Sequence, residues 1–440
     1  MTTSADARQM MAWIEAVVAQ GIRRPGYPAD RWVEGWAAEE LRRLGLADVR
    51  LEPVELPYWE PRHAELIAGD ERYVGFPLPH AAPGDVDAEL TLDGGDVRGR
   101  LAVSQLDLLR MPQSGFRLLA TSAYDPEGDF DTLEQVLPFG ARFREVMDPA
   151  IAAGALGFVG LLTGFPWETR DYYVPYDAVA RPIPGVWLSG ADGRRLLARL
   201  ARGPVHGRLT VDVVQHPVTT HNVIGTLPGR SNEWVVIASH HDAPWASAVE
   251  DASGIALVLA QAALWAALPR EERPHNLLFL LTSGHMAEAA GTRAFIARYA
   301  ALLERTVLQL HLEHVARRCI AIDGALQPTD EPEVRWWFTS RIPALQRAVA
   351  AALATHDLRR SLVLPPDVFG PMPTTDGAYF HPAGVPLVHF LTAPMYLFDS
   401  CDTLDKIHQA SLEPLTHAVA DIIRTTRGVS AAAMRAAVSA

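Results

Sequence analysis

The sequence predicts an α/β fold in which a mostly parallel sheet is sandwiched between helices. Three strand-like runs in the second half of the chain are apolar along nearly their whole length: "EWVVIAS", "NLLFLLTS" and "VPLVHFL". Strands that are continuously apolar, rather than apolar at every second residue, are typical of a sheet buried on both faces. Helix-like segments follow these runs in regular alternation, which indicates parallel strands joined by crossover helices.

The helices and strands can be followed in order. The first 70 residues indicate two amphipathic helices and then extended segments; Asp30 can cap the second helix and Gly45 can end it. Between "HNVIGTLPG" and the C-terminus, the expected helices are "GIALVLAQAALWAAL", "TRAFIARYAALL", "IPALQRAVAAALATH" and "SLEPLTHAVADIIRTT". A further strand, "VLQLHLEHV", lies between the second and third of them.

Residues 76–218 differ from the rest of the chain in their pattern of apolar and turn-forming residues. Short strand-like runs such as "ELTLDG" and "GRLTVDVV" are separated by Gly, Pro and Asp, with one Ala-rich helix near "DPAIAAGALGFVGLL". This pattern predicts a β-rich module inserted into a larger α/β domain, which would consist of residues 1–75 and 219–440.

Composition excludes several classes of partner. The net charge of −13 disfavours nucleic acid and anionic membrane surfaces, because both are bound mainly through Lys and Arg. The sequence has no run of about 20 consecutive apolar residues, so a transmembrane helix is not expected. Glu15 interrupts the apolar run at the N-terminus, so a signal peptide is not expected. With two cysteines, Cys319 and Cys401, a reducing cytoplasm is the expected location.

Polar clusters follow three of the predicted strands, where each strand ends. They are "SHHD" (239–242), "SGHM" (283–286) and "HLEH" (311–314). Open α/β sheets place their chemistry at the carboxyl ends of the strands. The side chains that would meet there are imidazoles and carboxylates: His240, His241, Glu250, Asp251, His285, Glu313 and His314. Such groups suit a divalent ion such as zinc, which makes a metal-dependent hydrolase the natural interpretation.

These motifs resemble those of the co-catalytic zinc aminopeptidases, relatives of bacterial leucyl aminopeptidases, glutamate carboxypeptidases and glutaminyl cyclases. "VVIASHHDA" resembles the strand that ends in G-A-H-x-D, and "SAVEDASGIALVLAQA" resembles the G-A-x-D-D-x-S-G-V-A segment. "FLLTSGHMAEAAGTRAF", "LHLEHV" and "TTDGAYFHPAGVPLV" resemble the later motifs. The resemblance implies a mixed, mostly parallel aminopeptidase-like sheet, and residues 76–218 would be its inserted protease-associated domain.

The resemblance also implies a metal set. By position, the ligands of one zinc match His240, Glu250 and Glu313, although Glu250 is one methylene longer than the usual bridging aspartate. The ligands of the second zinc match Met286 and Phe398, and neither side chain suits zinc in such a site. We therefore expect one divalent ion, with zinc favoured and iron or manganese as alternatives.

The same comparison suggests two catalytic residues. His285 stands where the family has its general base, and it could serve as a base or as a fourth metal ligand. Both roles remain open. Asp242 matches the aspartate that orients the metal-binding histidine from the outer shell.

Several residues are candidates for contact with substrate, each with a purely structural alternative. Asp376 matches a residue that supports the site wall, or it forms a turn with Gly377. The others could face the substrate or pack in the core: His314, His389, Trp245, Trp336, Trp337 and Tyr396.

The expected function is hydrolysis of an amide or peptide-like bond in a small-molecule or peptide-like substrate. Aminopeptidase activity itself is less expected, because the family holds the free α-amine through the second metal and glutamates that are absent here. Two alternatives are a catalytically silent, ligand-binding member of the fold and a metal-free lyase or cyclase that uses His285 and Glu313 as acid and base.

Overall fold

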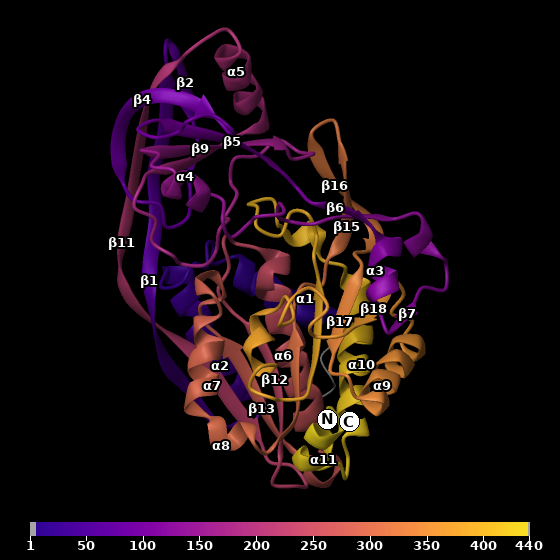
Figure 1. Ribbon diagram of the computed structural model, residues 1–440. Coiled ribbons are helices and arrows are strands. Elements are labelled where there is room, and N and C mark those ends of the chain that lie inside the picture. Colours follow the sequence, from indigo (N-terminus) through magenta and orange to yellow (C-terminus); the bar gives the residue numbers. More distant parts are fainter. Residues whose placement is uncertain (1–5, 439–440) are drawn as a thin grey trace.

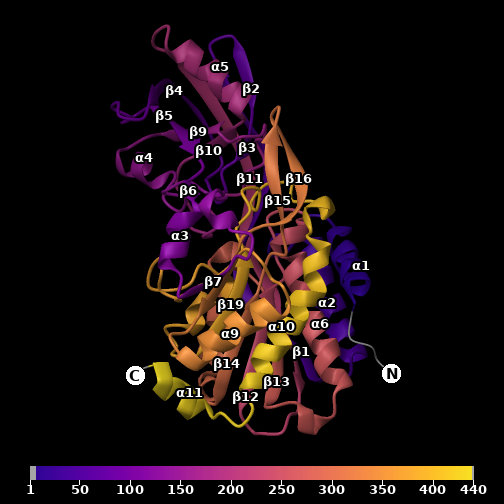
Figure 2. The same cartoon turned by 90° about the vertical axis from the view of Figure 1, so that its right-hand side faces the viewer.

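The computed structural model describes residues 6–438, which form two lobes joined by a pair of long strands (Figures 1 and 2). Strands β1 (Ala47–Ala68) and β11 (His206–Leu227) pair antiparallel along almost their whole length and run from one lobe into the other. The lower lobe of Figure 1 holds the large helix-covered sheet, and the upper lobe holds most of the β-rich region.

The sheet of the lower lobe has the order β11-β13-β12-β14-β19-β17-β18-β7. Its inner strands are β12 (Trp234–His240), β13 (Asn276–Thr282), β14 (Thr306–Leu312), β19 (Leu387–Thr392), β17 (Arg335–Thr339) and β18 (Ser361–Leu364). Four of the pairs are parallel, whereas β11 with β13, β17 with β19, and β7 with β18 are antiparallel. The predicted α/β fold with a mixed, mostly parallel sheet is confirmed.

Both faces of this sheet are buried, which explains the continuously apolar strands. On β12, Val235 and Ile237 pack into the large core that includes helix α6. Their neighbours Val236 and Ala238 pack on the other face, in a cluster that contains Phe295 of helix α7. The main helices of the lower lobe are α1 (Ala7–Val18), α2 (Pro28–Arg43), α6 (Ser253–Ala267), α7 (Ala290–Arg298), α8 (Ala300–Leu303), α9 (Pro343–Thr355), α10 (Leu412–Thr425) and α11 (Ala431–Val438).

One stretch of the described chain, Ala248–Ala267, is long and apolar enough to cross a membrane. Its whole hydrophobic window is buried inside the fold, where α6 contacts α1, α10 and the sheet. Burial of this kind is typical of a core helix.

The upper lobe continues the sheet in the order β11-β4-β5-β9-β10-β3. Its elements are β2 (Glu71–Val74), β3 (Phe76–Pro77), β4 (Gly84–Leu92), β5 (Leu101–Asp107), α4 (Asp148–Ala152), β9 (Gly157–Gly164), β10 (Gly185–Leu188) and α5 (Gly190–Leu200). The division of the chain at residues 76 and 218 stays a prediction.

Part of the predicted insert packs on the other lobe. We name residues 109–144 the crossing segment. It contains β6 (Arg110–Pro112), α3 (Gln113–Leu119), β7 (Ser122–Tyr124), η1 (Asp129–Asp131) and β8 (Glu134–Val136). Strand β7 pairs with β18 at the edge of the lower sheet, and Phe116 and Phe130 enter an apolar cluster with Trp336 and Phe338 of β17. A hairpin of β15 (Arg317–Ile322) and β16 (Ala325–Pro332) rises between the lobes (Figure 2).

Candidate active site

His240 is the last residue of β12, and one of its ring nitrogens is fixed by the backbone. Its Nδ1 lies 3.0 Å from the carbonyl oxygen of Asp242, to which it donates, so Nε2 carries the lone pair. Burial lowers the pKa of His240 well below its usual value, and the neighbouring His285 and His314 lower it further. The side chain is therefore a neutral imidazole, the form that binds metal ions.

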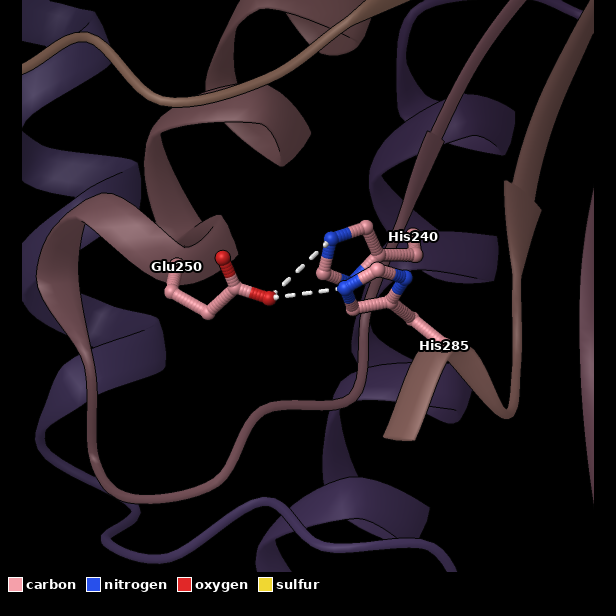
Figure 3. A group of neighbouring side chains, drawn as sticks. All are labelled: His240, Glu250 and His285. Atoms are coloured by element: carbon pink, nitrogen blue, oxygen red, sulfur yellow. Dashed lines mark ion pairs between the residues drawn. The ribbon is translucent and has the colours of Figure 1, made fainter. Parts of the chain in front are cut away.

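The carboxylate of Glu250, in the short turn η2 (Ala248–Ala252), points at the rings of two histidines (Figure 3). Its Oε1 is 3.5 Å from Nε2 of His240 and 3.3 Å from Nε2 of His285. Its Oε2 is 2.6 Å from Nε2 of His314. None of these contacts has hydrogen-bond geometry, and among the described residues neither oxygen has a hydrogen-bond donor. A buried carboxylate in this setting requires a positive charge beside it.

Two buried charged residues from opposite ends of the chain hold the backbone around Glu250. Asp402 accepts the N–H groups of Val249 and Glu250, each at 2.9 Å. Arg23 donates to the carbonyl oxygen of Ser247 at 2.9 Å and to that of Glu250 at 3.2 Å. Sequence reasoning missed Arg23, because its partners lie more than 200 residues away along the chain and no local motif marks it. Asp402 opens the "DTLDKI" motif, so a signal for it was present.

Asp242 acts on the other catalytic candidate, His285. Its carboxylate accepts the N–H of His285 at 3.0 Å and that of Met286 at 2.9 Å, and so fixes the turn that follows β13. It is the backbone oxygen of Asp242, and not its carboxylate, that orients His240. The predicted orienting role of Asp242 is therefore divided between its main chain and its side chain.

The imidazole of His285 lies between two carboxylates. Its Nδ1 is 3.4 Å from Asp376 Oδ1, its Nε2 faces Glu250, and its ring stacks on that of His240 with 4.2 Å between centroids. Burial lowers the pKa of His285, but the interaction with Asp376 and the charge of Glu250 outweigh burial and raise the pKa to about 9. Without a bound cation, His285 would thus be protonated at neutral pH.

Glu313, which follows β14, contacts a different histidine, His311. Its Oε1 is 2.8 Å from His311 Nε2 and accepts the backbone N–H of Asp376 at 2.9 Å. Among the described residues, one group whose ligand atoms lie within 4.8 Å of one another contains His240, Glu250 and His285, and Glu313 is in no such group. Two of the three predicted ligands, His240 and Glu250, therefore lie together with His285.

His314 and Asp251 form a second candidate group with His240. Asp251 already accepts the hydroxyl of Ser239, the N–H of Gly254 at 3.0 Å and the N–H of His314 at 3.2 Å, which marks it as a structural carboxylate. Nδ1 of His314 donates to the carbonyl oxygen of Thr392 at 2.9 Å, which leaves Nε2 facing Glu250. Burial lowers the pKa of His314, but the charge of Glu250 outweighs it and raises the pKa to about 10.

A third group of possible ligand residues consists of Asp30, Glu34 and His241. Nδ1 of His241 is 2.9 Å from Asp30 Oδ1. Burial lowers the pKa of His241, but the charge of Asp30 outweighs it and raises the pKa to about 9. These residues form a buried ion pair that ties α2 to the end of β12.

A cavity of about 600 Å³ is lined by one of the candidate ligands, His285, and by His314 beside Glu250. Of the predicted site residues, those that line it are His285, Glu313, His314, Asp376 and Trp336. The others do not line it. His389 is hydrogen-bonded to Thr375 and Gln309, Tyr396 donates to the carbonyl oxygen of Arg317 at 3.0 Å, and Trp245 packs against Arg24. Trp337 is buried in the large core.

The positions that correspond to a second zinc site are apolar in the structure. Met286 is 1% exposed and belongs to the main core. The ring of Phe398 lies 4.7 Å from that of Tyr176, which in turn lies 5.2 Å from His285. Tyr176 and Arg144 line the cavity but lie in the predicted insert, outside every motif, and sequence reasoning missed both.

Comparisons with known proteins agree with this fold. Residues 222–423 match the family model described as peptidase family M28. Among curated proteins, none matches the chain.

Solved structures match nearly the whole chain. An aminopeptidase from Aneurinibacillus sp. strain AM-1 is 20% identical with a TM-score of 0.66, and the match covers 97% of this chain and 95% of the other. For BSAP, a zinc aminopeptidase from Bacillus subtilis, identity is 16%, the TM-score 0.70 and coverage 96% and 94%. For a peptidase M28 precursor from Shewanella amazonensis SB2B, identity is 19%, the TM-score 0.71 and coverage 95% and 92%. At these identities the likeness shows the fold.

Proposed function

We propose that the protein, whose residues 222–423 match the model of peptidase family M28, is a metal-dependent hydrolase of an amide or peptide-like bond. A single divalent ion, preferably zinc, would be held by His240, Glu250 and His285. The observation that carries this proposal is the convergence of these three buried side chains without hydrogen bonds to one another.

The residues fit a metal ion by three criteria. The Nε2 of His240 is buried, carries the lone pair and has no hydrogen-bond partner among the described residues. Both oxygens of Glu250 lack a hydrogen-bond donor in the same part of the chain. Two imidazoles and a carboxylate are a donor set found in catalytic zinc sites, which use three protein ligands and keep one position open.

When bound, the ion would supply a positive charge that polarises a carbonyl group and lowers the pKa of water. The protein's own side chains would position the reacting groups and transfer the proton. Asp242 fixes the turn that carries His285, and Asp376 faces the outer nitrogen of that ring. His314 lines the cavity, and in the metal-free protein the charge of Glu250 raises its pKa to about 10, so that its Nε2 carries a proton. We assign to His314 the delivery of this proton to the departing nitrogen.

Classical aminopeptidase activity is not part of the proposal. Met286 and Phe398 offer no ligand for a second ion. Of the carboxylates that line the cavity, Glu288 pairs with Arg144 at 2.6 Å, and one oxygen of Glu313 lies 2.8 Å from His311. We propose a cytoplasmic setting, which the free cysteines Cys319 and Cys401 support.

A second candidate is metal-free acid and base chemistry, as in a lyase or cyclase. It is favoured by the raised pKa values of His285 and His314, since these two imidazolium groups could neutralise Glu250 without an ion. Elemental analysis of the purified protein separates the two. One zinc, iron or manganese per chain, lost in a Glu250→Gln variant, supports the hydrolase. A metal-free protein that binds none on titration supports the alternative.

A further inference from the structure

The cavity that His285 lines has two chemically different ends. The polar end consists of His285, Glu313, His314 and Asp376. The remainder is mainly apolar and lies between the crossing segment and the lower lobe. It is lined by Met111, Phe116 and Leu119 of the crossing segment, and by Trp336, Phe369 and Leu391 of the lower lobe.

The apolar end is preformed. The ring of Phe116 lies 5.2 Å from that of Trp336 and 5.6 Å from that of Phe369, and Trp336 lies 5.3 Å from Phe369. Behind this aromatic wall, Phe116 joins an apolar cluster with strands of the lower sheet. Gln135 of β8 donates to the carbonyl oxygen of Ala393 at 2.8 Å, which ties the crossing segment to the lower lobe. A ligand would therefore meet a formed surface, and little ordering would be needed on binding.

Two apolar side chains of this wall remain in contact with solvent. Leu119 is 46% exposed and Phe369 is 37% exposed, although both line the cavity. Away from the polar end, the charged groups that line the described cavity are Arg144 and Glu288, and these pair at 2.6 Å. The apolar end of the cavity, which we name the arm, thus offers apolar surface and no unpaired charge. Such a surface suits an uncharged substituent.

We propose that this arm binds a long alkyl chain, so that the substrate is an amide of a medium- or long-chain acid whose carbonyl group lies at the polar end. The proposal rests on the proposed hydrolase function and names its substrate class. A cavity of about 600 Å³ falls within the range that encloses drug-sized ligands, well beyond the needs of a single amino-acid side chain.

Straight-chain 2-alkanones from four to ten carbons test the proposal, because they carry a carbonyl and an alkyl chain but no bond to hydrolyse. Binding would be measured by calorimetry on the protein as purified and after treatment with EDTA. We expect the dissociation constant to fall about fourfold per added methylene, in both states, since each buried methylene contributes about 0.8 kcal/mol. A dissociation constant that does not change with chain length would overturn the proposal.

Neighbouring leucines on α3 provide a matched pair of variants. Leu119→Asp places a charge in the arm, whereas Leu118→Asp changes a residue that is 88% exposed and does not line the cavity. We expect Leu119→Asp and Phe369→Asp to weaken binding of 2-decanone at least tenfold and Leu118→Asp to leave it unchanged. Equal binding by all three folded variants would contradict the proposal.

Two further outcomes separate the possibilities. Tighter binding of 4-phenyl-2-butanone than of 2-decanone, which has the same number of carbons, would overturn the alkyl assignment in favour of an aryl group. Chain-length-dependent binding without hydrolysis of N-acyl anilides would remove the hydrolase function and leave the binding site intact. Hydrolysis together with binding that does not change with chain length would support the hydrolase function and overturn the alkyl-binding site.

Discussion

The carboxylate of Asp242 holds His285 by the main chain, accepting its N–H at 3.0 Å and that of the next residue at 2.9 Å. The side chain of Asp242 therefore determines the position of the imidazole that follows the neighbouring strand, β13.

Asp242→Asn should weaken metal binding about 10- to 100-fold, as is usual when an outer-shell partner is lost. The amide can accept one of the two N–H groups, but its NH₂ would face the other, so the turn at His285 must shift. Competition with a fluorescent zinc chelator measures the affinity. An affinity equal to that of the native protein would show that the turn keeps its place without Asp242.

Replacing His285 and Glu313 in turn distinguishes the ligand set seen in the structure from the one predicted from sequence. Because His285 faces Glu250 and Glu313 faces His311, His285→Ala should lower metal affinity more than Glu313→Gln does. We expect His285→Ala to exceed the roughly 100-fold loss that outer-shell changes produce. A larger loss of metal affinity in Glu313→Gln than in His285→Ala would indicate that Glu313 binds the metal ion and that His285 acts as a base.

Arg23→Met should destabilise the protein by at least about 3 kcal/mol, because buried carbonyl oxygens around Glu250 would lose their charged donor. Urea denaturation measures this change. Arg8→Met is the control: Arg8 is exposed in α1, and surface substitutions usually change stability by less than about 0.5 kcal/mol. Equal effects of the two substitutions would contradict the assigned role of Arg23.

The buried imidazole of His80 should make the stability of the protein depend on pH. It is buried beside Trp59, and burial lowers its pKa from 6.5 to about 4. Between these values the unfolded chain binds the proton and the folded protein does not, so stability falls as pH decreases from 6.5 to 4. For a shift of this size the loss is up to about 3 kcal/mol.

His80→Asn removes this contribution, and asparagine tolerates the positive φ of 60° at this position. The free energy of unfolding of the variant should therefore depend less on pH than that of the native protein over this interval. Parallel curves for the two proteins would show that His80 does not titrate as stated.

The parts of the site that the sequence predicted are those encoded locally. A strand and the polar residues at its end are neighbours in sequence, so His240, Glu250 and His285 could be placed at one sheet edge, and parallel pairing of His240 with Thr282 brings two of these ends together. The choice between His285 and Glu313 as third ligand could not be predicted, because it depends on which way each side chain turns.

The parts that could not be predicted depend on contacts between distant segments. The crossing segment has no motif, and its position follows from the pairing of β7 with β18, more than 230 residues further along the chain. Tyr176 reaches His285 from the predicted insert in the same way. Predictions for Trp245, His389 and Tyr396 rested on residue type alone, and buried aromatic and histidine side chains more often pack than line a cavity.

Anomalous X-ray diffraction from crystals grown with zinc tests the central claim most directly. We predict one strong anomalous peak per chain, about 2.0 to 2.2 Å from Nε2 of His240, Nε2 of His285 and a carboxylate oxygen of Glu250. A site without a peak, or with a peak bound by Glu313 and not by His285, would contradict it.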